Sequence, residues 1–204
     1  MQIASLIGAM PKQQLKKKAE NERRLEELAA AIRVCVRCPL HESRTLAVPG
    51  DGTVKAKVMI IGEAPGRDED TTGHPFVGAA GRFLDSVLEG SGIRREDLFI
   101  TNTVKCRPPQ NRTPRRLEVD TCTSNYLFEQ IELINPQLVM LLGSVAAKKV
   151  LGIKTIGEAR GQVIERDGRK YLVGYHPAVR FYREDLAEKV REDFDLLRRV
   201  IEQL

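Results

Sequence analysis

Short apolar runs alternate with amphipathic helical segments along most of the chain. The apolar runs are continuous and rich in β-branched residues, as in strands buried on both faces of a sheet. These expected strands are 58–61, 98–104, 138–142 and the two halves of a hairpin, 163–165 and 171–173. Apolar residues at helical spacing predict helices over residues 12–34, 78–90, 116–133, 144–152 and 184–204.

This alternation indicates the fold class and a division of the chain. Strands that alternate with helices favour a parallel sheet with helices on both faces. We therefore expect an α/β fold of three layers, α/β/α, around a central, mostly parallel sheet of four strands. Residues 1–34 are expected to form an N-terminal helical extension, in which 1–11 stay unassigned, and residues 35–204 to form the main domain.

Polar or glycine-rich segments follow the strands at the points where the strands end. They are 62–66, 102–106, 143–144 and 175–178. Ligands of open parallel sheets bind outside the carboxyl ends of the strands. We therefore expect these four segments to converge on one rim of the sheet. The acidic run at 67–70 is expected to be a solvated face.

Composition limits the class of protein. The chain has 204 residues, of which 42% are hydrophobic and 30% charged, as in a globular rather than a disordered protein. No apolar run reaches the roughly 18 residues that a membrane-spanning helix needs. No secretory signal pattern stands at the N-terminus. We expect a cytoplasmic protein without a membrane partner.

The net charge of +5 can be assigned to one segment of the chain. Between positions 105 and 116 stand five cations and no acid, together with three prolines: Lys105, Arg107, Arg112, Arg115 and Arg116 are the cations. A solvated loop is one interpretation. Concentrated charge on a proline-stiffened loop favours the other, contact with backbone phosphates of a nucleic acid.

The four cysteines fall into two pairs, Cys35-x2-Cys38 and Cys106-x15-Cys122. Thiols of a cytoplasmic protein stay reduced, so ligands are favoured over disulfides. Two pairs with none left over predict a metal site. Zinc and an iron–sulfur cluster both remain open, although scattered thiolates are more typical of a cluster.

Three side chains at the expected rim are candidates for chemistry. Phe76 lies between Pro75 and Val77 outside any periodic pattern, where its ring could stack on a planar ligand. Asn102 ends an apolar strand, and its carboxamide offers a donor and an acceptor side by side. His176 stands before a proline at the end of the last strand, where a catalytic role is as well supported as an ordinary buried one.

Taken together, these motifs resemble the family 4 uracil-DNA glycosylases of bacteria and archaea. The matching pieces are the cysteine pairs, Gly-Glu-Ala-Pro-Gly at 62–66, Pro-Phe-Val-Gly at 75–78, Thr-Asn-Thr-Val-Lys-Cys-Arg-Pro-Pro at 101–109 and His-Pro-Ala at 176–178. The resemblance covers the chain from about Cys35 onward. It implies that residues 35–204 are a uracil-DNA glycosylase domain, which excises uracil from DNA at the start of base-excision repair.

The resemblance also implies roles for individual residues. The four cysteines would hold a structural [4Fe–4S] cluster. Uracil would be bound by Gly62, Glu63, Ala64, Phe76, Asn102 and His176, with Glu63 and His176 catalytic. DNA would be contacted by the five cations of the 105–116 segment and by Arg180. One of Arg180, Phe181 and Tyr182 would fill the gap left by the flipped base.

Two alternatives remain. The best-known branch of the superfamily has a catalytic Asp where Ala64 stands, so another carboxylate must position the water; Glu63 is our choice and Glu69 the second. A non-catalytic iron–sulfur or zinc protein that binds nucleic acid is the rival function, but phosphate binding does not require Phe76, Asn102 or His176. We expect a monomer that acts on uracil-containing DNA. No motif for binding a sliding clamp is recognisable at either terminus.

Overall fold

The computed structural model describes residues 12–204, so the unassigned segment 1–11 lies outside the described part. Six strands form one sheet in the order β1-β3-β2-β4-β6-β5. The four central strands are parallel, and each outer strand is antiparallel to its neighbour. Their bounds are β1 (Asp51–Gly52), β2 (Val58–Gly62), β3 (Leu98–Asn102), β4 (Leu138–Leu142), β5 (Ile164–Arg166) and β6 (Arg169–Gly174).

The expected α/β fold with a mostly parallel sheet is confirmed, but the sheet has six strands rather than the four that were expected. The short strands β1 and β5 extend the parallel centre at its two edges. The strand expected over 98–104 ends at Asn102. Beyond it, the amides of Thr103 and Val104 donate to the carbonyls of Gly62 and Glu63, at 2.9 and 3.1 Å. These bonds fasten the loop after β3 to the loop after β2.

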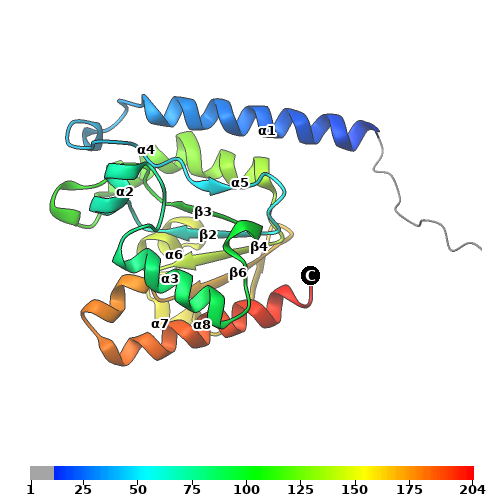
Figure 1. Cartoon of the computed structure of the whole chain (residues 1–204), viewed down its shortest axis with the longest axis vertical. Helices are drawn as coiled ribbons and strands as arrows, with labels where there is room; N and C mark the ends of the chain where they lie inside the picture. Colours follow the sequence, from blue (N-terminus) through cyan, green and yellow to red (C-terminus); the bar gives the residue numbers. More distant parts are fainter. Residues whose placement is uncertain (1–11) are drawn as a thin grey trace, which may run out of the picture.

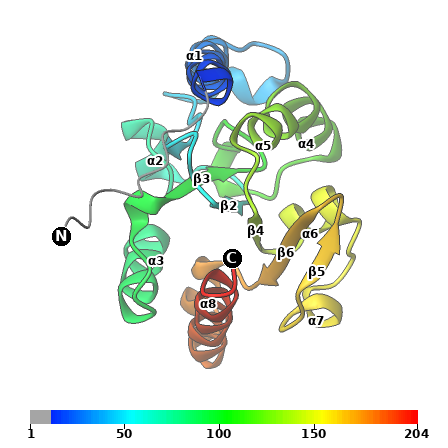
Figure 2. The same ribbon diagram turned by 90° about the vertical axis from the view of Figure 1, so that its right-hand side faces the viewer.

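Helices cover both faces of the sheet (Figures 1 and 2). Val58 and Ile60 of β2 pack with the helices of one face, whereas Met59 and Ile61 pack with those of the other. This period of two is what a strand buried on both sides requires. The first face carries α3 (Ala79–Gly90) and α8 (Ala187–Ile201), and the second carries α5 (Phe128–Ile134), α6 (Ser144–Leu151) and α7 (Ile156–Ala159).

Most expected helices are present with shifted ends. The helix expected over 116–133 is α4 (Arg116–Cys122) and α5, joined through a π-helical segment, Thr123–Leu127. The last helix starts later than expected, at Ala187, after a short 3₁₀ turn. No helix of residues 12–204 is both long and apolar enough to cross a bilayer.

The helix expected as an N-terminal extension, α1 (Lys12–Arg33), lies along α5 (Figure 1). Asn21 donates to the carbonyl of Leu133 at 2.9 Å. Leu28 and Ile32 are buried, and they share a hydrophobic cluster with the four cysteines. The second half of α1 is therefore packed on the main domain.

The acidic run 67–70 is not a solvated face. It forms part of a short helix, α2 (Arg67–Thr72), in which Glu69 and Asp70 are buried. The side chain of Asp70 accepts a hydrogen bond from the amide of Thr45 at 2.9 Å. A charge pattern alone did not indicate these partners, because they come from distant loops.

Candidate active site

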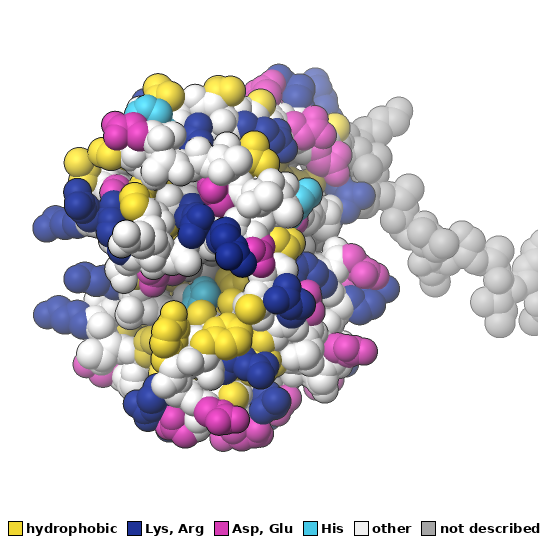
Figure 3. Space-filling view, turned by 60° about the vertical axis from the view of Figure 1, so that its left-hand side comes forward, with side chains coloured by type: hydrophobic (Ala, Val, Ile, Leu, Met, Phe, Trp, Pro, Cys, Tyr) yellow, Lys and Arg dark blue, Asp and Glu magenta, His cyan; other side chains and the backbone are white. Residues whose placement is uncertain are grey.

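A cavity of about 620 Å³ opens at the carboxyl ends of the central strands. Its lining includes residues that follow β2, β3 and β6, as the rim hypothesis predicted: Glu63, Ala64, Asn102 and His176. Phe76 lines it as well. The segment at 143–144 does not line this cavity; Gly143 instead packs against His176. Figure 3 shows a hollow with a histidine side chain at its floor and hydrophobic side chains along one edge.

Gly62 lies beneath the cavity, where three pieces of chain meet. A Cβ at this position would lie 2.4 Å from Asn102 Oδ1 and 2.6 Å from Phe76 Cζ. Both distances are far below a van der Waals contact. Glycine is therefore required for Asn102 and Phe76 to lie this close to the end of β2.

Asn102 presents a buried acceptor that has no partner. Its side chain is 2% exposed, and its Oδ1 has no hydrogen-bond partner among the described residues. An unsatisfied buried oxygen costs about 1–3 kcal/mol. Because Asn102 lines the cavity, a ligand N–H entering it could supply the missing bond.

Phe76 is held in an unusual backbone conformation. Its φ is 52°, in the left-handed region that bulky residues rarely occupy. Gly81 of α3 makes room for it, since a Cβ at Gly81 would lie 2.0 Å from the Phe76 carbonyl oxygen. The Phe76 ring is 5% exposed and lines the cavity. The ring is thus fixed in place by its own backbone and by α3.

Glu69 ties together the two loops on either side of the cavity. Its Oε1 accepts from the amides of Val77 and Gly78, at 2.9 and 2.8 Å. Its Oε2 accepts from the amide of Gly66 at 3.0 Å. Both carboxylate oxygens are therefore engaged by the backbone, which leaves Glu63 as the freer of the two candidate carboxylates.

Glu63 stands at the cavity edge directly after β2. Its side chain is partly buried, and this burial raises the pKa of the Glu63 carboxyl above its ordinary value of 4.5. A carboxylate with a raised pKa is a better proton acceptor than an exposed one. Glu63 can therefore serve as a base.

His176 lies beside Phe76, and both rings line the cavity. The two ring centroids are 5.6 Å apart and the rings are inclined by 29°. His176 Nδ1 accepts from the amide of Ala178 at 3.2 Å, so the proton of the neutral ring resides on Nε2. Burial lowers the pKa of His176 to about 4, with Glu69 opposing the shift. At neutral pH, His176 is an uncharged donor through Nε2.

Two residues that the sequence reasoning missed hold the chain before His176. Asp193 of α8 accepts from the amide of Tyr175 at 2.9 Å. Arg160 binds Asp193 at 2.6 Å and places its guanidinium 5.4 Å from the centroid of the Tyr175 ring. Asp193 lies on α8 and Arg160 directly after α7, so no local motif could indicate them.

All four cysteines line one second pocket, between the end of α1 and α4. Among residues 12–204, no three His, Cys, Asp or Glu side chains are close enough to hold a single metal ion. Three polar groups donate to cysteine sulfurs: Arg44 Nη1 to Cys106 Sγ at 3.1 Å, the Lys105 amide to Cys122 Sγ at 3.3 Å and the Arg37 amide to Cys35 Sγ at 3.5 Å. The four thiols thus line one shared pocket, where burial raises the pKa of the Cys38, Cys106 and Cys122 thiols in spite of these hydrogen bonds.

Lys105 is not a DNA contact, contrary to the expectation. It is 1% exposed, and its Nζ donates to Thr101 Oγ1, Asn102 O and Gln130 Oε1 at 2.6, 2.9 and 2.6 Å. Burial lowers the pKa of Lys105 to about 7. A side chain enclosed in this way cannot reach a phosphate. Its position within a cationic run concealed this burial.

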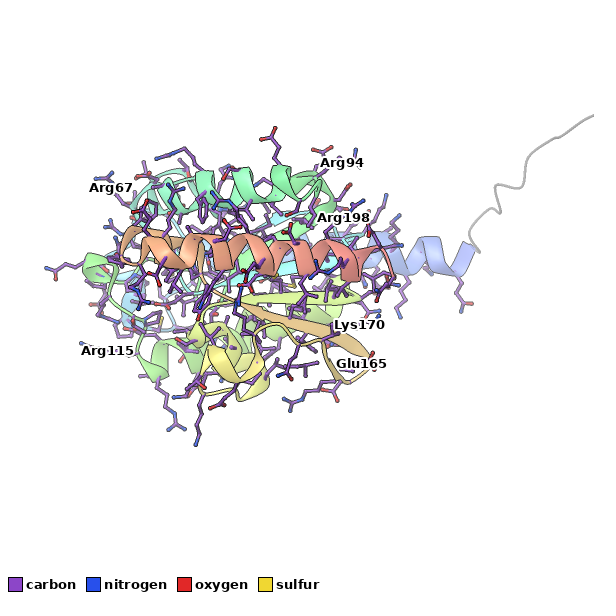
Figure 4. The ribbon with its side chains drawn as sticks, turned by 90° about the horizontal axis from the view of Figure 1, so that it is seen from below. Arg67, Arg94, Arg115, Glu165, Lys170 and Arg198 are labelled. Carbon is purple, nitrogen blue, oxygen red and sulfur yellow. The ribbon has the colours of Figure 1, made fainter. Side chains whose placement is uncertain are left out.

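The other expected cations differ in their availability. Arg112 is bonded to the buried Glu118 through both terminal nitrogens, at 2.7 and 2.9 Å. Arg107 lines the cavity, whereas Arg115 and Arg116 are exposed. In Figure 4, Arg115 and Arg67 lie at one end of the molecule, opposite Arg94, Glu165, Lys170 and Arg198. Arg180 is exposed, and its guanidinium lies 4.4 Å from the centroid of the Phe83 ring.

Comparison with known proteins agrees with this geometry. Residues 49–202 match the family model of the uracil DNA glycosylase superfamily. A type-4 uracil-DNA glycosylase of Archaeoglobus fulgidus is 45% identical over 179 residues, which cover 83% of this chain and 89% of the relative. One of Thermotoga maritima is 41% identical, with 85% and 93% covered. The chain therefore belongs to the uracil-DNA glycosylase superfamily and, within it, to the type-4 family that its motifs resemble.

Proposed function

We propose that this protein is a uracil-DNA glycosylase of base-excision repair. It hydrolyses the N-glycosidic bond of a flipped-out deoxyuridine, which releases uracil and leaves an abasic site. The observation that carries the proposal is the buried, unpartnered Oδ1 of Asn102 at the floor of a cavity that also contains Phe76 and His176. The type-4 relatives, which match over most of the chain, support the same activity.

Recognition of uracil follows from these three side chains. The Asn102 carboxamide accepts from uracil N3–H through Oδ1 and donates to O4 through its amino group. Cytosine presents the reverse pattern and would leave both groups unpaired, which a buried site rejects strongly. The Phe76 ring stacks on the flipped base. The backbone at Glu63 and Ala64 completes the wall, whereas Gly62, expected to bind uracil, is not among the residues that line the cavity.

His176 assists departure of the base. Negative charge develops on the uracil ring as the glycosidic bond breaks. Neutral His176 donates its Nε2–H to uracil O2 and so stabilises that charge. The bond from the Ala178 amide to Nδ1 orients the ring before the base arrives, at 3.2 Å. Asp193 and Arg160 support this orientation through Tyr175.

Glu63 orients the attacking water and accepts its proton. The carboxylate lies at the cavity edge, and nothing on the backbone occupies it in the way that Gly66, Val77 and Gly78 occupy Glu69. Glu69 is assigned a different part, which is to hold the loops that carry Phe76. The proposal therefore takes Glu63, rather than Glu69, as the carboxylate that positions the water.

The four cysteines are proposed to hold a [4Fe–4S] cluster. Their thiols line one pocket, and scattered thiolates are more typical of a cluster than of a zinc site. Arg44 and the Lys105 amide donate to two of the sulfurs. When bound, the cluster would act as a structural crosslink between the end of α1, the loop after β3 and α4.

DNA is proposed to lie over the cavity mouth. Arg107, which lines the cavity, and the exposed Arg115, Arg116 and Arg180 are the proposed phosphate contacts, with Arg112 contributing less because Glu118 neutralises it. Tyr182, 85% exposed, lines the cavity and is the best placed residue to fill the gap in the helix. Lys105 is excluded from this surface by its burial.

Incubation with a uracil-containing oligonucleotide, followed by alkaline cleavage of abasic sites, tests the activity directly. We expect strand scission at the uracil position and none in a matched oligonucleotide with thymine or cytosine there. The His176→Ala variant controls for contaminating glycosylases, because it should retain the fold and excise more slowly. Absence of scission at every salt concentration would refute the proposed function.

A further inference from the structure

Lys105 is a buried cation that the proposed reaction does not use. Its ammonium group makes three hydrogen bonds, all to uncharged acceptors: Thr101 Oγ1, the carbonyl of Asn102 and Gln130 Oε1. No carboxylate forms an ion pair with Lys105 among the described residues. Burial of a charge is costly unless every donor is satisfied, and these three acceptors match the three N–H groups of the ammonium.

The three acceptors belong to a closed network around the end of β3. Thr101 Oγ1 and Gln130 Nε2 both donate to the carbonyl of Pro49, each at 2.9 Å. The carbonyl of Lys105 accepts from the amide of Val48 at 2.7 Å. Lys105 thus fastens β3, α5 and the segment before β1 to one another at a single point.

This point lies between the two functional parts of the molecule. The Nζ of Lys105 holds the main-chain carbonyl of Asn102, whose side chain reads the base under the proposed function. The amide of Lys105 donates to Cys122 Sγ at 3.3 Å, and Cys106 is the next residue in the chain. One residue therefore contacts both the base-reading strand end and the cysteine site.

We propose that Lys105 is a positioning residue, which fixes the main chain of Asn102 so that its carboxamide meets the base, and which passes the geometry of the cysteine site to the cavity. This inference rests on the proposed function and adds to it a residue that touches neither substrate nor solvent. Three hydrogen bonds from one side chain hold a strand end more rigidly than an apolar side chain could.

The main test is the Lys105→Met variant of the full protein loaded with its cluster. Methionine fills the space and buries no charge. We expect iron content and visible absorption close to wild type, and a dissociation constant for uracil-containing DNA, with its salt dependence, unchanged. The single-turnover rate of uracil excision should fall at least tenfold, and discrimination against cytosine should weaken. Lys149→Met, which removes a lysine bonded to Asp120 on the surface, is the matched control.

A second pair of variants decides the matter if Lys105→Met does not fold. Thr101→Val removes one acceptor of the ammonium group at constant shape, whereas Thr101→Ser keeps it. We expect slower excision in the valine variant and rescue by serine. Hydrogen exchange at the amides of Thr103 and Val104, which are bonded to the loop after β2, should be faster for Thr101→Val and for Lys105→Met.

The outcomes separate the two proposals. A folded, iron-replete Lys105→Met protein that excises at the wild-type rate would overturn the positioning role and leave the glycosylase assignment intact. The positioning role would also be overturned if the excision rate fell only in proportion to the loss of iron. It would be overturned as well if the salt dependence of DNA binding changed while the excision rate did not. If the wild-type protein does not excise uracil, the assignment fails, and faster exchange at Thr103 and Val104 still tests whether Lys105 fixes the strand end.

Discussion

Among single residues, Asn102 is the one whose position in the cavity most directly determines which base can bind under the proposed function. Its buried Oδ1 lacks a partner, and its neighbours Gly62 and Phe76 leave it little freedom to turn. We expect Asn102→Asp to weaken discrimination between uracil and cytosine by tenfold or more, because a carboxylate cannot donate to uracil O4. Release rates from matched uracil and cytosine oligonucleotides measure this. Wild-type rejection of cytosine by the variant would place base reading elsewhere.

The pH dependence of excision should report Glu63 and not His176. Because burial lowers the pKa of His176 to about 4, the ring stays neutral through the range where an ordinary histidine titrates. Burial raises the pKa of Glu63, so the carboxylate becomes protonated at a higher pH than an exposed glutamate would, and the base is then lost. We expect one acidic limb in single-turnover rates, absent from the residual activity of Glu63→Gln. A limb near pH 6.5 that disappears in a His176 variant would contradict this assignment.

At the scale of elements, the cavity depends on a close approach between strand ends. Gly62→Ala would push a methyl group against Asn102 Oδ1 and Phe76 Cζ, at 2.4 and 2.6 Å. We expect excision to fall by a hundredfold or more while the sheet survives. Gly90→Ala, at the end of α3 with nothing within 4 Å, is the control and should behave as wild type. Circular dichroism checks that both variants are folded, and single-turnover rates compare their excision. Equal rates in the two variants would mean that the close approach of Asn102 and Phe76 to Gly62 is not required.

The strands and the rim were predictable, since both follow from a local pattern. Continuous apolar runs mark β2, β3 and β4, and the parallel arrangement then brings 62–66, 102–106 and 175–178 together. The edge strand β5 was predicted as half of a hairpin, whereas the two residues of β1 are too few to give a pattern. The segment 143–144 was misplaced, because following a strand does not ensure that a residue faces the cavity.

The supporting residues were not predictable, because their burial and their hydrogen-bond partners become evident only in the folded chain. Glu69 was expected in a solvated run, yet it accepts amides from Gly66, Val77 and Gly78. Lys105 stands in a cationic run and points into the core. Asp193 lies on an amphipathic helix whose charged positions are otherwise exposed, and only the fold brings it to Tyr175. When a charged residue stands among other charged residues, nothing in the neighbouring sequence indicates that its side chain is buried.

For the whole molecule, the sequence assigned the net charge of +5 to the segment 105–116, and the structure shows that only some of its cations are available to DNA. Lys105 is buried and Arg112 is paired with Glu118, so the 105–116 segment offers Arg107, Arg115 and Arg116 to DNA. Changing these three arginines to glutamine should lower the slope of log K against log salt by about 0.9 per lost phosphate contact.

The control for this prediction lies at the far end of the molecule. Arg94, Lys170 and Arg198 stand opposite Arg115 in Figure 4, and the triple glutamine variant removes the same charge from that end. It should leave the salt slope of DNA binding unchanged. Equal slopes in both triple variants would show that net charge, rather than its position, governs binding.

The fixed conformation of Phe76 has a consequence for how the base is captured. With φ at 52° and its loop held by Glu69, the stacking surface exists before DNA arrives. A site that does not close around its base depends on spontaneous breathing of the duplex. Excision should therefore be fastest in single strands, slower at U·G and slowest at U·A, because the free energy needed to unpair the uracil rises in that order. Single-turnover rates on oligonucleotides of identical flanks measure this order, and equal rates would show that the protein drives the base out.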